Sequence, residues 1–517
     1  MRKLMMMGMF LLLAGTASRA NDLYVAQNAA GSATGTDCAN AHPASWFNSS
    51  SSWGTSLSQI GSGDTVHLCG TIGTALTVLG NGSSGSPVTV LFETGAKLSE
   101  PACPSTGCLN LDNRSWIVVD GGGPGGTNGI IESTSNGTGL ASQRQSVRGV
   151  QMDGATNITV KNLLIRNMYV HKVLPLDTAP SAPDPTAVHL FGSSNISIHD
   201  NSIHDANWAI FGGGGGNSVA VYNNDVFNVD HMVAIGVISN TSTGVDIYNN
   251  HFHDPANWDT SATACSGSSC YHHDGVHLFQ TAGGSIKNVS IYNNLFDGDW
   301  GIYNTAQIYT EGVDFTMTVY NNVFLGTTNN RNLNNGAMCL TVGPNGTVKA
   351  YHNTVIGSSS QQNGLVKVEG ASVDFRNNVV SGSSALIYLP SDVSFVQGGM
   401  DHNVWGGSGS PFYVCTSTCS FQSFSGFNSG LSSISGRGGS SVFTSNISLS
   451  ASGVPQSGSV VAGVGANLST SGIQPLNFDR VGSQRLAAAP AWDAGAYNVG
   501  GGSARPAAPS GLAVSVN

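Results

Sequence analysis

The sequence predicts an all-β fold, a single-stranded right-handed parallel β-helix with coils of about 22–31 residues. Two observations lead to this prediction. The chain repeats a short segment in which apolar and polar residues alternate before an asparagine, one variable residue and a large apolar residue. The composition includes 68 glycines and only 9% charged residues, and it is rich in Ser, Asn, Thr and Val, which favours short strands joined by turns over helices.

Each copy of the repeat is typical of a half-buried strand that runs into a polar turn. Clear copies begin at Asn157, Asn195, Ser218, Gly244, Asn288 and Met317, and weaker copies begin at Val348, Val373 and Met400. The marker asparagine of each copy falls at positions 162, 201, 224, 250, 294, 322, 353, 378 and 403. A second short strand follows in each interval, so successive coils would stack strand on strand at about 4.8 Å. We expect the marker asparagines to form a ladder of side chains inside the turns.

The order of segments along the chain predicts five regions. They are a signal peptide (1–20), an N-terminal cap with irregular early coils (21–156), regular coils (157–405), C-terminal coils with a closing segment (406–500) and a flexible tail (501–517). The first region has a basic start, an apolar core and a small residue, Ala20, at the expected cleavage point. No later segment has the roughly 18 apolar residues needed to cross a bilayer. We therefore expect a secreted or periplasmic protein.

Nine cysteines in an exported chain favour disulfide bonds. The close pairs are Cys103/Cys108, Cys265/Cys270 and Cys415/Cys419, with Cys38/Cys69 as a further pair, which leaves Cys339 over. The chain has no Cys-x-x-Cys pair and no His/Cys spacing typical of metal ligands, so no structural zinc site is expected.

The charge of the chain restricts its partners. A net charge of -10 with only 19 basic residues argues against nucleic acid, whose phosphates require a basic surface. It also disfavours a strongly anionic polymer, unless a bound cation reverses the local field. We expect a monomer without an organic cofactor.

The coil-length repeat, the Asn-Asn turns and the N-terminal start Leu23–Gln27 make the chain similar to known proteins over residues 21–500. It resembles the secreted right-handed parallel β-helix proteins of the pectate-lyase-like superfamily. That superfamily includes polysaccharide lyases, glycoside hydrolases, uronan epimerases, phage tailspikes and adhesins. The polygalacturonase-like motifs, the Asp-Pro-His signature of alginate epimerases and the Arg-rich segment of pectate lyases have no match here. The resemblance therefore implies the fold but assigns no catalytic residue.

Alignment of the second strands on a Val-x-Leu pattern predicts two outward columns. One contains His189, Ile210, Ala234, His277, Gln307, Cys339 and Lys367, and the other contains Thr186, Asn207, His231, Asp274 and Asn304. His231 and Asp274 would then lie in adjacent coils, close enough to hydrogen-bond. We predict His277 or His231 as a catalytic base, with Asp274 orienting it or acting as an acid. His273 and His253 complete the candidate catalytic set.

Two long turns, at residues 167–185 and 254–273, predict the walls of a cleft. Its predicted floor is Asp205, Asn207, Trp208, Asp230 and His231. The candidate substrate-binding residues are Asn207, Trp208, Trp258, Tyr271, Trp300, Tyr303 and Gln307, several of them aromatic as in sugar-stacking platforms. Calcium is the candidate cofactor, and its ligands would come from Asp205, Asp230, Asp254 and Asp297.

These residues predict a secreted carbohydrate-active protein whose partner is a polysaccharide laid along the β-helix. The leading hypothesis is a polysaccharide lyase that cleaves a uronic-acid-containing polymer by base-catalysed β-elimination, for which imidazoles supply the base. The first alternative is a glycoside hydrolase that uses paired carboxylates in the same cleft. The second is a non-catalytic glycan-binding protein or adhesin, which would not need stacked imidazoles.

Overall fold

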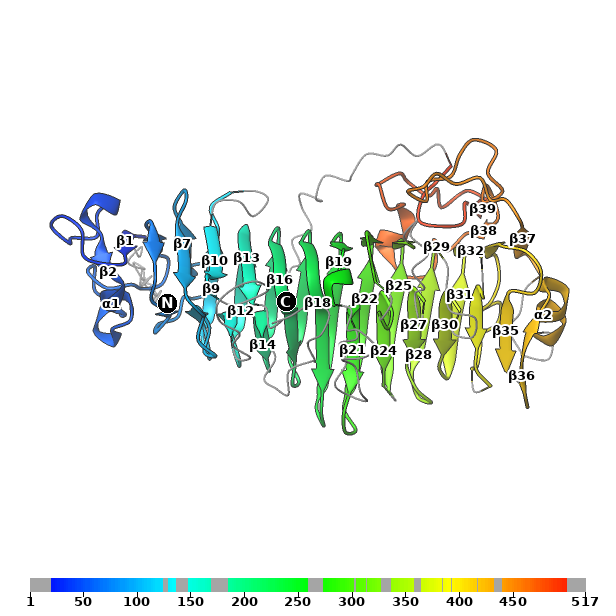
Figure 1. Ribbon diagram of the computed structural model, residues 1–517, viewed down its shortest axis with the longest axis horizontal. Helices are drawn as coiled ribbons and strands as arrows, with labels where there is room; N and C mark the ends of the chain where they lie inside the picture. The colour runs from blue at the N-terminus through cyan, green and yellow to red at the C-terminus, as the bar shows by residue number, and fades with distance from the viewer. Residues whose placement is uncertain are drawn as a thin grey trace, which may run out of the picture.

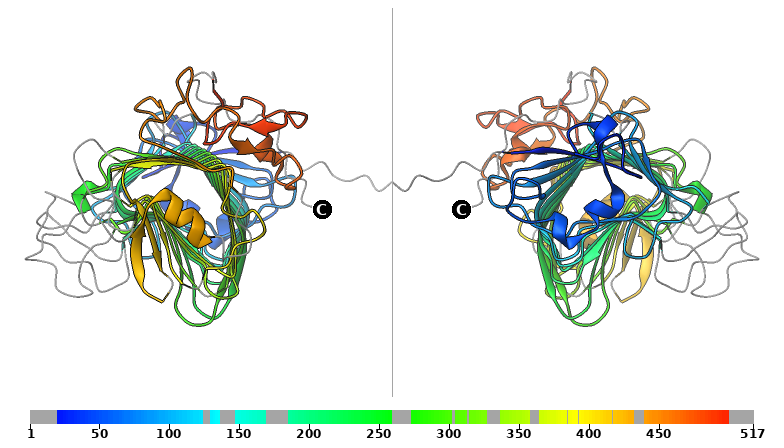
Figure 2. Two further views of the ribbon diagram at one scale, coloured as in Figure 1. Left: turned by 90° about the vertical axis from the view of Figure 1, so that its right-hand side faces the viewer. Right: turned by 90° about the vertical axis from the view of Figure 1, so that its left-hand side faces the viewer.

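The computed structural model describes residues 20–123, 129–135, 147–168, 185–258, 273–301, 304–312, 314–326, 336–357, 364–383, 385–391, 393–415, 417–431 and 439–499. Over these residues the chain is a parallel β-helix whose coils lie side by side along the long axis (Figure 1). Seen along that axis, the coils superpose (Figure 2). The predicted all-β, parallel β-helical fold is confirmed. The signal peptide and the tail, apart from Ala20, lie outside the described residues.

One face of the β-helix is a 13-stranded sheet in which neighbouring strands run parallel. Its strands, in spatial order, are β2 (His42–Pro43), β1 (Asp22–Ala26), β3 (Thr65–Leu68), β6 (Val88–Phe92), β9 (Ser115–Asp120), β12 (Thr156–Lys161), β15 (Ser194–His199), β17 (Asn217–Tyr222), β19 (Thr241–Tyr248), β22 (Ser285–Tyr292), β25 (Phe315–Tyr320), β28 (Thr347–Tyr351) and β31 (Ser372–Arg376). Alternate residues of these strands are buried, as the sequence pattern predicts.

The remaining strands of the coils form a 24-stranded sheet. One row within it contains β4 (Thr71–Ile72), β7 (Lys97–Glu100), β10 (Gly129–Ser133), β13 (Leu163–Met168), β20 (His251–His253), β23 (Leu295–Asp297), β26 (Val323–Leu325), β29 (Thr354–Gly357), β32 (Val379–Gly382), β34 (Val404–Gly406) and β37 (Val442–Thr444). The other row contains β5 (Leu76–Thr77), β8 (Leu109–Asn110), β11 (Arg148–Gln151), β14 (Thr186–Phe191), β21 (Asp274–Gln280), β24 (Ile308–Glu311), β27 (Met338–Thr341), β30 (Val366–Glu369), β33 (Ile387–Leu389), β35 (Phe412–Cys415) and β36 (Cys419–Gln422).

Two long strands, β16 (Ser202–Gly213) and β18 (Asp225–Val237), belong to both rows because they continue through the corner between them. The corner is made by residues with positive φ, namely Asp205 at 53°, Asn228 at 50° and Asp254 at 53°. Short polar side chains tolerate this left-handed conformation better than other non-glycine residues. The corner therefore separates two outward surfaces within one coil.

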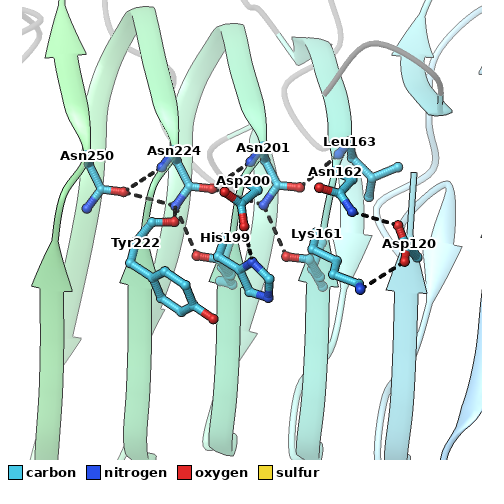
Figure 3. A network of polar contacts seen from close by, with 12 residues as sticks. Asp120, Lys161, Asn162, Leu163, His199, Asp200, Asn201, Tyr222, Asn224 and Asn250 are labelled. Atoms are coloured by element: carbon cyan, nitrogen blue, oxygen red, sulfur yellow. Dashed lines mark hydrogen bonds and ion pairs between the residues drawn. The ribbon is translucent and has the colours of Figure 1, made fainter. Parts of the chain in front are cut away.

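A ladder of buried asparagines follows the 13-stranded sheet, as predicted. The Nδ2 of Asn201 donates to the Oδ1 of Asn224 at 3.0 Å, and Asn224 donates to Asn250 at 3.0 Å (Figure 3). The same bond continues through Asn294, Asn322, Asn353, Asn378 and Asn403. The prediction fails at position 162, because Asn162 occupies the preceding left-handed position with φ 57°. Leu163 occupies the ladder position of this coil, and its backbone N–H donates to Oδ1 of Asn201 at 3.0 Å.

Short helices lie at the ends and corners of the solenoid. They are η1 (Cys38–Asn40), α1 (Ala44–Phe47), η2 (Ser50–Ser52), η3 (Ala256–Trp258), α2 (Phe424–Leu431) and η5 (Gln474–Asn477). Helix α2 crosses the C-terminal end (Figure 2), where Phe427 stacks on Phe412 with ring centroids 4.3 Å apart. No helix among the described residues is long and apolar enough to span a membrane.

Residues 445–499, the part of the predicted closing region 406–500 that follows β37, instead run back along the outside of the solenoid (Figure 1). They contain β38 (Gly465–Ala466) and β39 (Ala491–Trp492), which pair antiparallel. Trp492 packs with Tyr320 and Tyr351 of the 13-stranded sheet. The guanidinium of Arg485, buried beside them, donates to Asn321 Oδ1 at 3.0 Å. Helix α2 therefore has the closing role that was assigned to this segment.

Three of the predicted disulfide bonds are present. They are Cys38–Cys69, Cys103–Cys108 and Cys415–Cys419. Cys339 is free, as predicted, and it is buried although the strand alignment placed it in an outward column. The predicted pair Cys265/Cys270 lies outside the described residues.

Candidate functional site

The candidate site lies where β16, β18, β21 and β24 bring outward side chains of adjacent coils into register. Strand β18 pairs with β21 so that His231 lies opposite Asp274, as predicted. The two residues after His231, Met232 and Val233, are both fully buried in the core. Because two neighbouring side chains turn inward here, the residues on either side of them face outward, three positions apart. This interruption of strand alternation brings His277 onto the same surface as Asp274.

In β16 the predicted columns are displaced by one residue. Trp208 lies opposite His231, where Asn207 was predicted. Phe211, rather than Ile210, occupies the outward column of the same coil, and Ile210 is fully buried. Asn207 still contributes to the site from beside this column, because its Nδ2 donates to the carboxylate of the residue before His231 at 3.1 Å.

In β24 the displacement is two residues. Tyr309 lies opposite His277, where Gln307 was predicted. Gln307 precedes Ile308, which aligns with the core residue Val276, and it is itself fully buried. Neither amide atom of Gln307 has a hydrogen-bond partner among the described residues. The structure therefore gives Tyr309 the position beside His277 and leaves Gln307 away from the exposed surface.

His231 lies between two carboxylates. Its Nδ1 is 2.8 Å from Oδ2 of Asp230, and its Nε2 is 3.4 Å from Oδ2 of Asp274. The second carboxylate is held by the backbone N–H of Ala306, which donates to Asp274 Oδ1 at 3.0 Å. Burial lowers the pKa of His231, but Asp230 and Asp274 outweigh it and raise that pKa to about 10. His231 is therefore an imidazolium at neutral pH.

His277 has the opposite electrostatic character. Its Nδ1 is 3.5 Å from Asp274 Oδ2, and its Nε2 is 3.5 Å from Glu311 Oε1. Burial lowers the pKa of His277, the charge of His231 acts in the same direction, and the two carboxylates oppose them without overcoming them. The hydroxyl of Tyr309 donates to Glu311 Oε2 at 3.2 Å, and burial raises the pKa of Tyr309. A neutral imidazole therefore adjoins a protonated phenol.

Carboxylates and imidazoles thus alternate along the site, and only the last carboxylate is exposed. The order is Asp230, His231, Asp274, His277 and Glu311. The side chain of Glu311 is 52% exposed, whereas that of His277 is 7% exposed and that of Asp274 is fully buried. The array therefore opens to solvent at Glu311.

Aromatic rings enclose the two histidines. Trp208 stacks on His231, with ring centroids 4.5 Å apart and planes 10° apart. The ring centroid of Phe279 lies 4.8 Å from that of His277. The ring centroid of Phe211 lies 4.1 Å from that of Trp208 and 6.3 Å from that of Phe279. Such surroundings lower the local dielectric constant, which strengthens the interactions between the charged groups. Trp208, Phe211 and Phe279 are each half-buried, so part of each ring remains open to a ligand.

Other predicted site residues have different surroundings. Trp258 and Trp300 are 0% and 1% exposed, so neither presents a ring face to a sugar, contrary to the prediction. His273 is fully buried and its Nε2 lies 2.8 Å from the carbonyl oxygen of Trp300. Tyr271 and Tyr303 lie outside the described residues, as do residues 169–184 and 259–272 of the turns predicted to wall the cleft.

The four aspartates predicted to bind calcium each contact a different histidine. The contacts are Asp205 with His204 at 2.5 Å, Asp230 with His231 at 2.8 Å, Asp254 with His253 at 2.7 Å and Asp297 with His251 at 2.7 Å. Calcium takes six to eight oxygen ligands in one shell. Each of these carboxylates already contacts an imidazole, and the calcium site stays a prediction.

Two groups of described residues place three potential metal ligands within 4.8 Å of one another. They are His231, Asp274 and His277, and Asp225, His251 and His253. The second group lies before the corner, on β18 and β20, and it includes the candidate catalytic residue His253. Burial lowers the pKa of His251, but its aspartate partners outweigh burial and raise it to about 9.

Four residues around these two groups were not selected from the sequence. Tyr309 was missed because the strand alignment was displaced in β24, and Glu311 was not selected because it was expected to follow that strand. Asp225 and His251 fill the variable position of the repeat, directly after a ladder asparagine, in two adjacent coils. That position faces outward, so its polar residues in successive copies were a usable signal.

Comparisons with known proteins give only distant structural matches. No protein-family model matches the sequence, and no curated protein matches it. Among solved structures, pectate lyase Pel9A is 15% identical, with 93% of this chain and 97% of that chain covered and a TM-score of 0.38. The GH136 lacto-N-biosidase from Eubacterium ramulus is 11% identical, with 77% and 68% covered and a TM-score of 0.41. XylC in complex with xylose is 11% identical, with 75% and 84% covered and a TM-score of 0.36. Similarity at this level carries no argument about activity. The activity proposed below is argued from the residues of the site.

Proposed function

We propose that the protein is a secreted polysaccharide lyase that cleaves a uronic-acid-containing polymer by β-elimination. The observation that carries this proposal is the alternating array of Asp230, His231, Asp274, His277 and Glu311, which ends at the surface beside Tyr309. It supplies a neutral base and a protonated acid side by side, the two groups that β-elimination requires.

His277 acts as the base in this proposal. Asp274 faces Nδ1 and favours the tautomer that carries its proton there, which leaves the lone pair of Nε2 on the side of Glu311, the exposed end of the array. His231 is a positioning residue, because its positive charge lies beside Asp274 and disfavours a proton on His277. Asp230 in turn holds His231 protonated.

Tyr309 acts as the acid. Its ring centroid lies 5.1 Å from that of His277, and its raised pKa keeps the hydroxyl protonated. In the reaction Nε2 of His277 takes the proton from the carbon next to the carboxyl group. The electron pair forms a carbon–carbon double bond, the glycosidic carbon–oxygen bond breaks, and Tyr309 protonates the leaving oxygen.

The charge at the surface selects the substrate. Glu311 adjoins the base, so a free uronate carboxylate would approach a like charge. A methyl-esterified uronate avoids this repulsion, and its ester carbonyl accepts the developing negative charge without a neutralising cation. We therefore expect an esterified polymer to be cleaved faster than its free-acid form, most clearly at low ionic strength.

The test is incubation of the full-length protein with uronic-acid polymers in esterified and free-acid forms. We expect an unsaturated product, seen as ultraviolet absorbance, and its loss in His277→Gln and Tyr309→Phe. The control is His204→Gln, which removes an imidazole–carboxylate contact from the other side of the corner. New reducing ends without ultraviolet absorbance would replace the lyase proposal with a glycoside hydrolase. Binding without cleavage, retained in His277→Gln, would replace it with a glycan-binding role.

A further inference from the structure

A second group of imidazoles and carboxylates lies before the corner, on strands β18, β20 and β23. We propose that Asp225, His251 and His253 bind a divalent transition-metal ion of the zinc class. Asp225 and His251 are directly paired in adjacent coils, and His253 follows on the same outward side of β20. Phe252 between the two histidines is fully buried and fixes the strand in the core.

The ligand atoms converge on a single point. Oδ1 of Asp225 is 3.1 Å from Nδ1 of His251 and 3.2 Å from Nε2 of His253. The two rings stack with centroids 4.1 Å apart and planes 21° apart. Ligands bound to one zinc ion at about 2.0–2.2 Å lie about 3.0–3.5 Å from one another. The two distances from Asp225 therefore match those between ligands that share one ion, and all three ligand atoms lie within 4.8 Å of one another.

The other nitrogen of each ring provides independent support. His251 Nε2 is 2.7 Å from Asp297 Oδ1, and His253 Nδ1 is 2.7 Å from Asp254 Oδ2. Histidines that bind a metal almost always donate their second N–H to a carboxylate, a carbonyl or water, which fixes the tautomer. Binding of the ion would displace the proton on the nitrogen beside Asp225, and the remaining proton of each ring would face Asp297 or Asp254.

The donor set selects the metal. Two imidazole nitrogens and one carboxylate oxygen suit zinc and its first-row neighbours, whereas calcium requires a shell of oxygens. The side chains of His251 and Asp225 are 34% and 47% exposed, so the ion would keep a coordination position that faces solvent. No zinc motif is visible in the sequence, because the ligands of the proposed ion come from two adjacent coils and not from one local segment.

The experiment uses full-length protein treated with a chelator, dialysed and titrated with zinc chloride by calorimetry. Cobalt(II) absorption spectra provide a second readout of nitrogen coordination. We expect one zinc ion at this site, with affinity reduced at least 100-fold in Asp225→Asn and His253→Ala. Asp297→Asn, which leaves all three ligands in place, should weaken binding about 10–100-fold.

Two controls separate this site from others. His199→Ala removes an outward-facing imidazole whose Nδ1 lies 2.6 Å from Oδ2 of Asp200, and it should leave zinc affinity unchanged. His277→Ala tests the other group of potential ligands and should also retain the proposed ion. Far-ultraviolet circular dichroism checks that each variant is folded. Absence of zinc binding, or binding lost in His277→Ala but retained in His253→Ala and Asp297→Asn, would overturn the proposal.

Discussion

Replacement of Asp230 by asparagine removes the nearer of the two carboxylates that flank His231 while preserving the shape of the side chain. The rise in the pKa of His231 from 6.5 to about 10 corresponds to about 5 kcal/mol, at about 1.36 kcal/mol per pH unit. Breaking a buried ion pair by removal of one partner typically costs about 3–5 kcal/mol. We therefore expect Asp230→Asn to lower the free energy of unfolding at pH 7 by about 3–5 kcal/mol.

The same substitution should change the protonation of His231. Burial remains and lowers its pKa, while Asp274 alone opposes that effect. We expect the pKa of His231 to fall to its ordinary value or below. Histidine-selective isotope labelling and ring-nitrogen chemical shifts followed against pH would measure it directly.

The matched control is Asp205→Asn, which breaks the equivalent contact with His204 on a more exposed surface. An exposed pair contributes about 0–1 kcal/mol, so this variant should remain close to the wild type in stability. The reasoning is refuted if His231 stays protonated above about pH 8 in Asp230→Asn. Equal losses of stability in the two variants would contradict the assigned role of burial.

Three further predictions concern the scaffold and its pH dependence. Asn294→Ala removes four side-chain hydrogen bonds and should cost about 4 kcal/mol in chemical denaturation, at about 1 kcal/mol per bond. The exposed Asn288→Ala should cost much less, and similar losses would argue against the ladder as a source of stability. Arg485→Leu removes bonds to Asn321 and three backbone carbonyls, so limited proteolysis should release residues 445–499 while the coils resist cleavage. Because the folded-state pKa of His231 is raised to about 10, its stabilising contribution is complete below about pH 6.5 and is lost as pH rises toward about 10. Thermal denaturation against pH should show a steeper loss over this range in the wild type than in Asp230→Asn.

The repeat made the fold predictable, because its asparagines and alternating strands mark every regular coil. The same spacing predicted the pairing of His231 with Asp274. Positions within the second strands were less certain, since two successive residues turn inward and interrupt the alternation. In β16 a run of apolar residues fits two alignments, and in β24 the buried Thr310 hides the apolar pattern. The alignment therefore placed Gln307 where the structure has Tyr309.

Burial of aromatic residues in turns could not be predicted from sequence. Trp258 and Trp300 follow polar turn residues, and composition does not tell whether such a side chain faces solvent or the solenoid. The contacts of the predicted calcium ligands were likewise not read from composition. Asp205 and Asp254 each contact the histidine before them, whereas Asp297 contacts His251 of the adjacent coil.

The asparagine ladder also has a direction. From Asn201 to Asn378 each Nδ2 donates to the Oδ1 of the next asparagine along the solenoid, so each Oδ1 from Asn224 to Asn403 accepts from the preceding coil. Their amide dipoles therefore align along the solenoid instead of cancelling, and each polarises its neighbours. Loss of one rung would weaken the bonds on both sides of it. Two substitutions in adjacent rungs should then deviate from the sum of the single effects, whereas two distant substitutions should add.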